Sequence, residues 1–234
     1  PILCNGGTAT VTIAATGGTA PLSYTFNSQT NTTGIFTGVL AGNNLSYSIT
    51  DGNSCTPLTG TINVTQPTAL SFTSATVTSP ILCNGGTATV TIAATGGIAP
   101  ISYTFNSQTN TTGIFTGVLA GTNLAYSITD GNSCTPLTGT INVTQPTAIA
   151  INSINSNTPI CQGSTLNLTS SATGGTGVIT YAWTGPNSFI SNLQNPSIIG
   201  ATILASGTYT LSVTDANGCS VNSSINVSIN GINS

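Results

Sequence analysis

The sequence contains no lysine, arginine, histidine or methionine, and its only acidic residues are Asp51, Asp130 and Asp215. Without a cation the chain cannot neutralise phosphate groups, which excludes nucleic acid as a partner. Anionic membrane surfaces are excluded for the same reason. No His or Lys can act as the base that activates a serine nucleophile, so a hydrolase triad is excluded as well. We expect no catalytic residues and a protein that is not an enzyme.

Long apolar runs and helical patterns are also missing. No apolar run approaches the roughly 20 residues that a membrane span needs, so no membrane insertion is expected in this segment. No stretch carries an apolar stripe of 3.6-residue period, which predicts essentially no helix. Hydrophobic residues nevertheless make up 38% of the chain and charged residues 1%. Disordered chains combine low hydrophobicity with high charge, so we expect this chain to fold.

The chain is built from a repeated unit. Residues 1–70 recur as residues 80–149, and the two copies differ at only five positions. A third copy has diverged but keeps the same spacing of its marker residues, and each copy contains a cysteine-bearing segment: 45–55, 124–134 and 209–219. We predict three domains, residues 1–67, 68–146 and 147–234, of which the first lacks its leading strand. We expect the chain to be part of a longer array.

Within each repeat, apolar and polar residues alternate with a period of two, as in half-buried strands. In the first repeat, Ala9, Val11 and Ile13 alternate with threonines. Six or seven short strands in a unit of about 80 residues predict an all-β protein of tandem Greek-key β-sandwich modules, Ig-like or PKD-like, arranged end to end. The aromatic residues expected in the cores, rather than on a sugar-binding platform, are Tyr24, Phe26 and Trp183.

Six cysteines stand at matching positions of the repeats: Cys4, Cys55, Cys83, Cys134, Cys161 and Cys219. A metal site is disfavoured because there is no Cys-x-x-Cys pair and no histidine. We therefore predict three disulfides and an oxidising, extracellular location. The favoured pairing lies within each repeat: Cys4–Cys55, Cys83–Cys134 and Cys161–Cys219. Pairing between neighbouring repeats is the alternative, because the spacing of cysteines does not fix their connectivity.

Each aspartate stands four residues before a closing cysteine, at the start of a turn. A turn-shaping role is the expected one, since aspartate side chains bond the backbone a few residues on. Asp51, Asp130 and Asp215 are also weak candidates for calcium, because carboxylate and amide oxygens suit that ion. One carboxylate per site would bind it weakly. We otherwise predict no metal and no cofactor.

The first two repeats, residues 1–146, resemble the SprB-type repeat of the cell-surface adhesins of gliding bacteria. The likeness rests on the Cys-x12-Gly-Gly spacing, on Thr-Asp-Gly-Asn-Ser-Cys and on Val-Thr-Gln-Pro. Residues 147–234 resemble the Ig-like or PKD-like repeats of the same class of proteins through Cys161-Gln-Gly-Ser-Thr-Leu, Tyr181-Ala-Trp-Thr-Gly-Pro and Thr214-Asp-Ala-Asn-Gly-Cys. The resemblance implies very large secreted proteins, exposed on the cell surface and moved along the cell during gliding.

The leading functional hypothesis is a structural stalk segment of a long extracellular cell-surface adhesin or filament, involved in surface attachment and gliding. Its partners would be adjacent repeats of the same chain. One alternative is a carbohydrate- or surface-binding module that contacts surface polysaccharide, for example through outward rows such as Thr8, Thr10 and Thr12. Another is a fibre subunit that assembles laterally with other copies, because uncharged edge strands have few repulsive groups.

Overall fold

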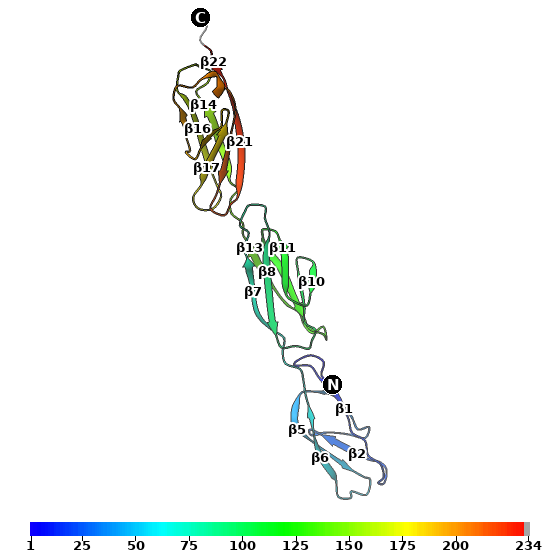
Figure 1. Ribbon diagram of the computed structural model, residues 1–234. Helices are drawn as coiled ribbons and strands as arrows, with labels where there is room; N and C mark the ends of the chain where they lie inside the picture. Colours follow the sequence, from blue (N-terminus) through cyan, green and yellow to red (C-terminus); the bar gives the residue numbers. More distant parts are fainter. Residues whose placement is uncertain (232–234) are drawn as a thin grey trace. The chain divides into compact units, whose positions relative to one another are not determined.

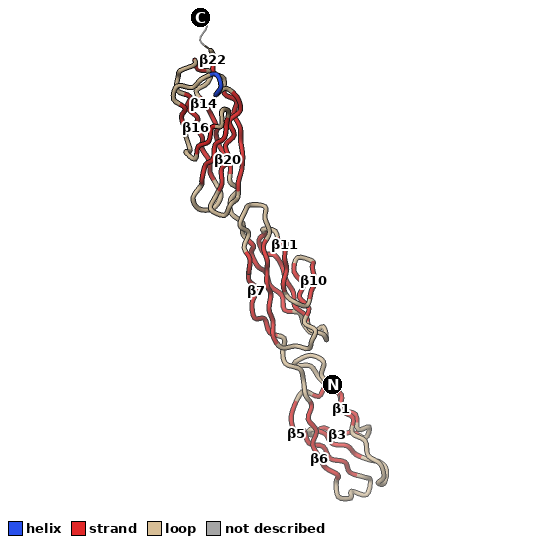
Figure 2. The backbone as a smooth tube through the Cα atoms, viewed as in Figure 1, coloured by secondary structure: helices blue, strands red, loops and turns tan. Residues whose placement is uncertain are grey.

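The computed structural model describes residues 1–231, which form β-strands joined by turns, with one helical turn at Ile203–Ala205 (Figures 1 and 2). The predicted all-β fold with essentially no helix is confirmed. In this described range, no helix is both long enough and apolar enough to cross a membrane.

The first repeat forms two antiparallel sheets. Its β-branched and aromatic residues favour extended backbone, and Gly- and Asn-rich turns separate them. Strands β1 and β4 form one sheet, and the other has the order β3-β2-β5-β6. Asn27 and Ser28 join β2 to β3 with φ angles of 44° and 69°, as a two-residue hairpin turn requires. The strands are β1 (Ala9–Thr12), β2 (Ser23–Phe26), β3 (Gln29–Asn31), β4 (Ile35–Val39), β5 (Gly42–Thr50) and β6 (Leu58–Val64).

The second repeat has the same strand order with one strand added. Its sheets have the orders β11-β8-β7 and β10-β9-β12-β13. The added strand is β7, which pairs beside β8 and corresponds to the leading strand that the first repeat was predicted to lack. The strands are β7 (Ser71–Ser79), β8 (Ala88–Thr95), β9 (Ser102–Phe105), β10 (Gln108–Asn110), β11 (Ile114–Val118), β12 (Gly121–Thr129) and β13 (Leu137–Val143).

The third repeat follows the same plan, with the orders β14-β16-β19 and β18-β17-β20-β21. Strand β15 pairs in parallel with β22 at the end of the repeat. The strands are β14 (Ala150–Ser156), β15 (Ile160–Cys161), β16 (Leu166–Thr173), β17 (Thr180–Gly185), β18 (Phe189–Ser191), β19 (Ser197–Ile198), β20 (Gly207–Thr214), β21 (Ser220–Val227) and β22 (Ile229–Asn230).

In every repeat the chain passes between two sheets, so that hairpin neighbours such as β5 and β6 stand beside non-consecutive neighbours such as β2 and β5. This is the Greek-key arrangement of Ig-like β-sandwiches. In the third repeat the two layers, one with β14 and β16 and the other with β17 and β21, can be followed in Figure 1. The predicted Ig-like sandwich fold is confirmed.

The core of the third repeat contains two aromatic residues whose polar atoms form hydrogen bonds to the backbone. Trp183 is fully buried, and its indole N–H donates to the carbonyl oxygen of Gln194 at 3.3 Å. Tyr209 is fully buried, and its hydroxyl donates to the carbonyl oxygen of Ala205 at 3.0 Å. A tyrosine at this corner that bonds the backbone just upstream is a hallmark of Ig-like domains.

The predicted inward faces are largely those observed. Tyr24, Phe26 and Trp183 are buried, so their placement in the core is confirmed. Strand β20 alternates strictly, with its apolar residues fully buried and its polar residues facing outward. Ile62 is an exception to the alternation of buried apolar and exposed polar residues, because 39% of its surface is exposed. It lies opposite Leu45 beside a shift in the β5–β6 register.

Contacts between residues divide the chain into two compact units. The first unit consists of Pro1–Thr76, Val90–Phe115 and Asn123–Ile141, and the second of Val77–Thr89, Thr116–Thr122 and the chain from Asn142 onward. Both units contain parts of the second sequence repeat. The domain boundaries after residues 67 and 146 therefore stay a prediction.

Candidate functional site

The turn that closes the first repeat is held by an aspartate side chain. Oδ1 of Asp51 accepts hydrogen bonds from the backbone N–H groups of Asn53 and Cys55, both at 3.1 Å. Oδ2 of the same carboxylate accepts the N–H of Thr19 at 3.2 Å. The carboxylate therefore shapes the turn that presents Cys55 and ties it to the loop that follows β1.

The other two repeats build the same turn. Oδ1 of Asp130 and of Asp215 accepts the N–H groups two and four residues later, at 2.9–3.2 Å. Oδ2 accepts the N–H of the residue after each Gly-Gly pair, at 3.1 Å and 2.8 Å respectively. The donors are Asn132, Cys134 and Ile98 in the second repeat, and Asn217, Cys219 and Thr176 in the third. The aspartates lie where a turn-shaping role requires.

These hydrogen bonds keep the carboxylates ionised. The backbone N–H of Cys55, followed by that of Thr19, holds the pKa of Asp51 below its ordinary value. The N–H of Cys134 has the leading effect on Asp130, whose pKa is also lowered. Hydrogen bonds donated to a carboxylate favour its charged form, so both groups are anionic at neutral pH.

Asp215 is also ionised at neutral pH, although burial opposes its ionisation more strongly than any single hydrogen bond favours it. Only 6% of its surface is exposed. Burial is the largest single influence and raises its pKa, but the N–H groups of Thr176, Cys219 and Asn217 together outweigh burial, and the pKa is lowered. The turn of the third repeat therefore also holds an anion.

The predicted pairing of the cysteines within each repeat is wrong. Cys4 is bonded to Cys134 and Cys83 to Cys219, with Cα atoms 5.6 Å apart in each pair. Each bond joins the first cysteine of one sequence repeat to the second cysteine of the next repeat, which is the alternative that the spacing left open. The closing turn is therefore tied to the start of the preceding repeat and not to the start of its own.

Hydrogen bonds beside each disulfide repeat the same connection. The side-chain Nδ2 of Asn132 donates to the carbonyl oxygen of Leu3 at 2.7 Å, next to the Cys4–Cys134 bond. Asn217 donates to the carbonyl oxygen of Leu82 at 3.1 Å, next to the second bond. The turn thus receives a cysteine-bearing segment through two adjacent contacts, one covalent and one a hydrogen bond.

The segment that enters the turn is itself held in place. Ile2 is buried in the core of the first repeat. Asn5 donates through Nδ2 to the carbonyl oxygen of Pro67 at 3.0 Å, and Oε1 of Gln66 accepts the N–H of Gly6 at 2.7 Å. The second repeat has the same brace, formed by Asn84 with Pro146 and by Gly85 with Gln145. The Gln-Pro pairs therefore hold the cysteine segment as well as ending a strand.

Cys55 and Cys161 are exposed free thiols, so the expectation that all six cysteines are paired is wrong within this chain. In the first repeat, Nδ2 of Asn53 donates to the hydroxyl of Thr19 at 3.0 Å, whereas Asn132 and Asn217 donate to the backbone of a cysteine-bearing segment. The side chain of Asp51 accepts a hydrogen bond from the Cys55 thiol and repels its thiolate, and both effects raise the thiol's pKa.

The carboxylate oxygens of the three calcium candidates face N–H donors, and a cation would have to displace those donors. In the part of the chain that the structure describes, no group of three or more His, Cys, Asp or Glu side chains is close enough to hold a metal ion. The turns at Asp51, Asp130 and Asp215 are thus built for backbone N–H groups.

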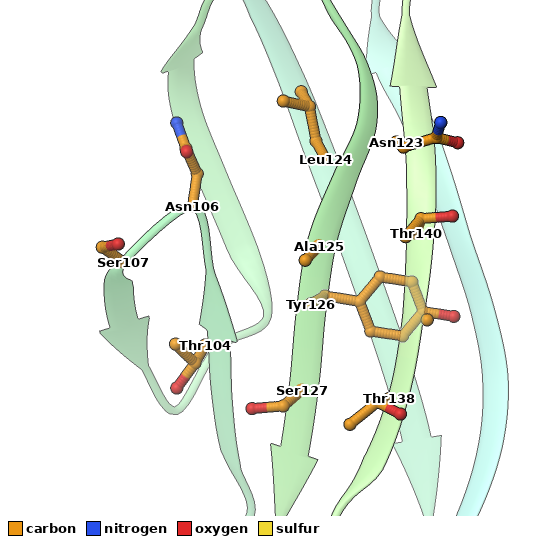
Figure 3. Close-up of a pocket in the computed structure, with 11 residues that line it drawn as sticks. Thr104, Asn106, Ser107, Asn123, Leu124, Ala125, Tyr126, Ser127, Thr138 and Thr140 are labelled. Atoms are coloured by element: carbon orange, nitrogen blue, oxygen red, sulfur yellow. The ribbon is translucent and has the colours of Figure 1, made fainter.

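A shallow groove of about 750 Å³ lies over strands β9, β12 and β13. Figure 3 shows the ring of Tyr126 across strand β13, between Thr138 and Thr140. Its hydroxyl end lies where a Cβ on Gly139 would be. The groove is lined by Thr104, Asn106, Ser107, Asn123, Leu124, Ala125, Tyr126, Ser127, Thr138, Gly139 and Thr140. A counterpart in the first repeat lies around Tyr47 and Gly60.

Sequence reasoning missed the asparagines and glutamines of these contacts. Asn53, Asn132 and Asn217 stand two residues before each closing cysteine, and Gln66 and Gln145 stand before a proline in the first two repeats. Their recurrence at fixed offsets was a signal that could have identified them.

Residues 75–110 match the SprB repeat family. A search of curated proteins found no match. Among solved structures, the chain is similar to Sidekick-1 immunoglobulin domains 1–5 (16% identity, TM-score 0.38, 98% of this chain and 57% of that one). It is also similar to the eight N-terminal Ig domains of Down Syndrome Cell Adhesion Molecule (14% identity, TM-score 0.43, 98% of this chain and 35% of that one). A third similar structure is that of the three N-terminal domains of the bacteriophage RB49 outer capsid protein Hoc (12% identity, TM-score 0.41, 99% of this chain and 96% of that one).

The chain thus spans about half of the Sidekick-1 structure and a third of the Down Syndrome Cell Adhesion Molecule structure. The family match falls on the second sequence repeat, whose sequence the first repeat shares almost entirely. The chain thus contains a segment that matches the SprB repeat, within a series of Ig-like β-sandwich repeats.

Proposed function

We propose that the chain is a stalk segment of a long cell-surface adhesin, which carries tension between the cell and the attached surface during adhesion and gliding. The observation that supports this proposal is the pair of disulfides, Cys4–Cys134 and Cys83–Cys219, each of which joins consecutive sequence repeats. Neither bond serves a catalytic or ligand-binding group, and we propose no catalytic role for the chain.

The two disulfides close overlapping loops. The loop from Cys4 to Cys134 and the loop from Cys83 to Cys219 share the residues between Cys83 and Cys134. A single break of the backbone anywhere between Cys4 and Cys219 therefore leaves both parts covalently joined. If the cysteines were paired within each repeat, no disulfide would span the segments between repeats, and one break there would separate the chain. Overlapping loops suit a stalk that is exposed to proteases and to pulling.

The same overlap limits how far the chain can extend. The shortest covalent path between the two bonds is the segment of about 50 residues from Cys83 to Cys134, which reaches roughly 180 Å when fully extended. After reduction, the path from Cys4 to Cys219 runs along the whole backbone and reaches roughly 700 Å. Unfolding of the oxidised chain under load would therefore release only a fraction of its contour length.

Force spectroscopy tests this proposal. The chain is held by handles at its two ends and pulled with and without a thiol reductant. We expect the oxidised chain to stop extending near the shorter limit after all repeats unfold, and the reduced chain to approach the longer one. An oxidised chain that extends as far as the reduced chain would contradict a tension-bearing role for the disulfides.

A second candidate function is the binding of surface polysaccharide. It is favoured by the groove beside Tyr126, whose lining of threonine, serine and asparagine side chains can hydrogen-bond sugar hydroxyls, and by its counterpart beside Tyr47. A glycan array probed with the whole chain tests it. Binding that is lost in a Thr138→Ala, Thr140→Ala variant would support this function, and an array without signal would leave the stalk as the function.

A further inference from the structure

We infer that the turn from Asp51 to Cys55 is a docking site for the cysteine-bearing Pro-Ile-Leu-Cys-Asn-Gly-Gly segment of another repeat of this type. The inference goes beyond the proposed stalk function because it assigns a binding surface and its partner to residues that are unpaired in this chain. It rests on two occupied copies of the same turn, at Cys134 and at Cys219.

The unoccupied turn and the occupied turn have the same residues and the same hydrogen bonds. Residues 51–55 and 130–134 are both Asp-Gly-Asn-Ser-Cys. In both turns the aspartate Oδ1 accepts the N–H groups two and four residues later, at 3.1–3.2 Å. Ser54 and Ser133 have φ angles of 54° and 55°. The turn that receives Leu3 and Cys4 in the second repeat is therefore already formed in the first.

The two turns differ in what the asparagine side chain bonds. Asn132 donates to the carbonyl oxygen of Leu3, whereas Asn53 donates to the hydroxyl of Thr19. Position 19 is one of the five positions at which the first two repeats differ, and the second repeat has Ile98 there. Thr19 thus supplies a substitute acceptor while the site is open. A threonine at this position does not prevent docking, because Asn217 bonds Leu82 with Thr176 at the equivalent position.

The structure also shows what the partner must present. In both occupied turns the incoming residues are leucine and cysteine, with the leucine carbonyl oxygen accepting from asparagine and the cysteine forming the disulfide. Leu3 and Leu82 keep more than half of their surface exposed, so recognition uses the backbone and the thiol. Bond formation joins the two sulfur atoms and releases two protons and two electrons, which a disulfide oxidant such as oxidised glutathione takes up as it becomes two thiols.

Cys161 is the other free thiol, but it does not lie in such a turn. It belongs to a cysteine-bearing segment, in strand β15, which pairs with β22. The two free thiols are therefore of different kinds: Cys55 lies on a receiving surface and Cys161 on a segment that would be received. This difference gives the experiment an internal control.

The test uses the whole chain and a capped synthetic peptide, Pro-Ile-Leu-Cys-Asn-Gly-Gly, in a glutathione redox buffer. A peptide of the same composition in scrambled order is the control. The mixed disulfides at equilibrium are measured by mass spectrometry, in a Cys161→Ser variant that leaves only Cys55 free and in a Cys55→Ser variant that leaves only Cys161. One additional hydrogen bond at Cys55 predicts about a five- to tenfold preference for the ordered peptide, and no preference at Cys161.

Two further variants test the recognition itself. Asn53→Ala removes the donor to the leucine carbonyl and is expected to abolish the preference, while Thr19→Ile removes the substitute acceptor and is expected to increase it. Equal capture of both peptides at Cys55 would overturn the inference. So would an Asn53→Ala variant that keeps the full preference for the ordered peptide. Neither result would affect the extension limit that tests the stalk function.

Discussion

Cys134 is bonded to Cys4, which lies 130 residues earlier in the chain, and Asn132 donates a hydrogen bond to the carbonyl oxygen of the neighbouring Leu3. The disulfide and the hydrogen bond therefore lie side by side. The hydrogen bond positions the cysteine segment, and the disulfide makes the junction permanent. The same relationship recurs between Cys219 and Cys83, so it is a property of the repeat and not of one junction.

Removal of the first disulfide should destabilise the chain strongly. In the chain-entropy model, a loop of this length contributes about 4–5 kcal/mol to the free energy of unfolding by restricting the unfolded state. We expect a Cys4→Ser, Cys134→Ser variant to lose most of that amount in urea unfolding followed by fluorescence of Trp183 and the tyrosines.

The matched control replaces the two free cysteines, Cys55→Ser and Cys161→Ser. Both side chains are exposed, so the free energy of unfolding should change by no more than about 0.5 kcal/mol. A control variant that loses as much stability as the first would show that Cys55 and Cys161 also form stabilising bonds, as pairing within each repeat requires.

A single backbone cut should not separate the chain. A protease recognition sequence is inserted after Thr56, in an exposed loop between Cys55 and Cys83. After cleavage, we expect one band on a non-reducing gel and two bands after reduction, because the Cys4–Cys134 bond spans the cut. The Cys134→Ser variant of the same protein should separate without a reductant. Separation of the parent protein would instead indicate that Cys4 pairs with Cys55.

The strands could be predicted because the information that specifies them is local. A period of two places Ala9 and Val11 on one face of β1, and Leu211 and Val213 on one face of β20, and burial against the facing sheet keeps them there. Ile62 departs from this pattern, and it lies beside a register shift that depends on how β5 pairs with β6 and not on the sequence of β6 alone. The turn role of the aspartates was also local, since each bonds N–H groups within four residues.

The disulfide connectivity could not be predicted, because the repeats are nearly identical. Cys4 and Cys83 have the same local sequence, and so do the closing cysteines Cys55 and Cys134. Only the contact between the closing turn of one repeat and the first segment of its neighbour decides between Cys4–Cys55 and Cys4–Cys134. That contact is made by Asn132 and the Leu3 backbone, and a carbonyl oxygen has no sequence signature.

The stability of the chain should fall in acid and stay level near neutrality. The folded-state pKa values of Asp51, Asp130 and Asp215 are lowered, so their contribution is complete above the unfolded pKa of about 4. It is lost as the pH falls through the lower folded values. We expect a thermal midpoint that is nearly constant from pH 5 to 8 and that falls below about pH 4.

An Asp130→Asn variant separates this effect from general acid denaturation. The amide keeps one acceptor oxygen but turns its NH₂ group toward an N–H donor, so the variant should be less stable at neutral pH. It should also lose part of the decline in acid, because one titrating carboxylate is gone. A midpoint that rises on acidification of the parent chain would contradict the lowered pKa values.

Gly139 should not tolerate a side chain, because the ring of Tyr126 occupies the space where a Cβ would lie (Figure 3). The ring is stacked on Phe72, with centroids 5.7 Å apart, and so is hindered from moving aside. We expect Gly139→Ala to lower the free energy of unfolding by about 1–3 kcal/mol, as overpacking of a filled site does. Urea unfolding measures the loss.

Gly60 provides the matched comparison. A Cβ there would meet Tyr47 in the same way, but among the described residues no ring is stacked on Tyr47 as Phe72 is on Tyr126, so Tyr47 can move more easily. Gly60→Ala should therefore cost less than Gly139→Ala. In a Tyr126→Ala background the additional cost of Gly139→Ala should disappear, which a double-mutant cycle would record as a coupling energy. Equal costs in both backgrounds would show that the glycine is required for another reason and that the tyrosine does not determine it.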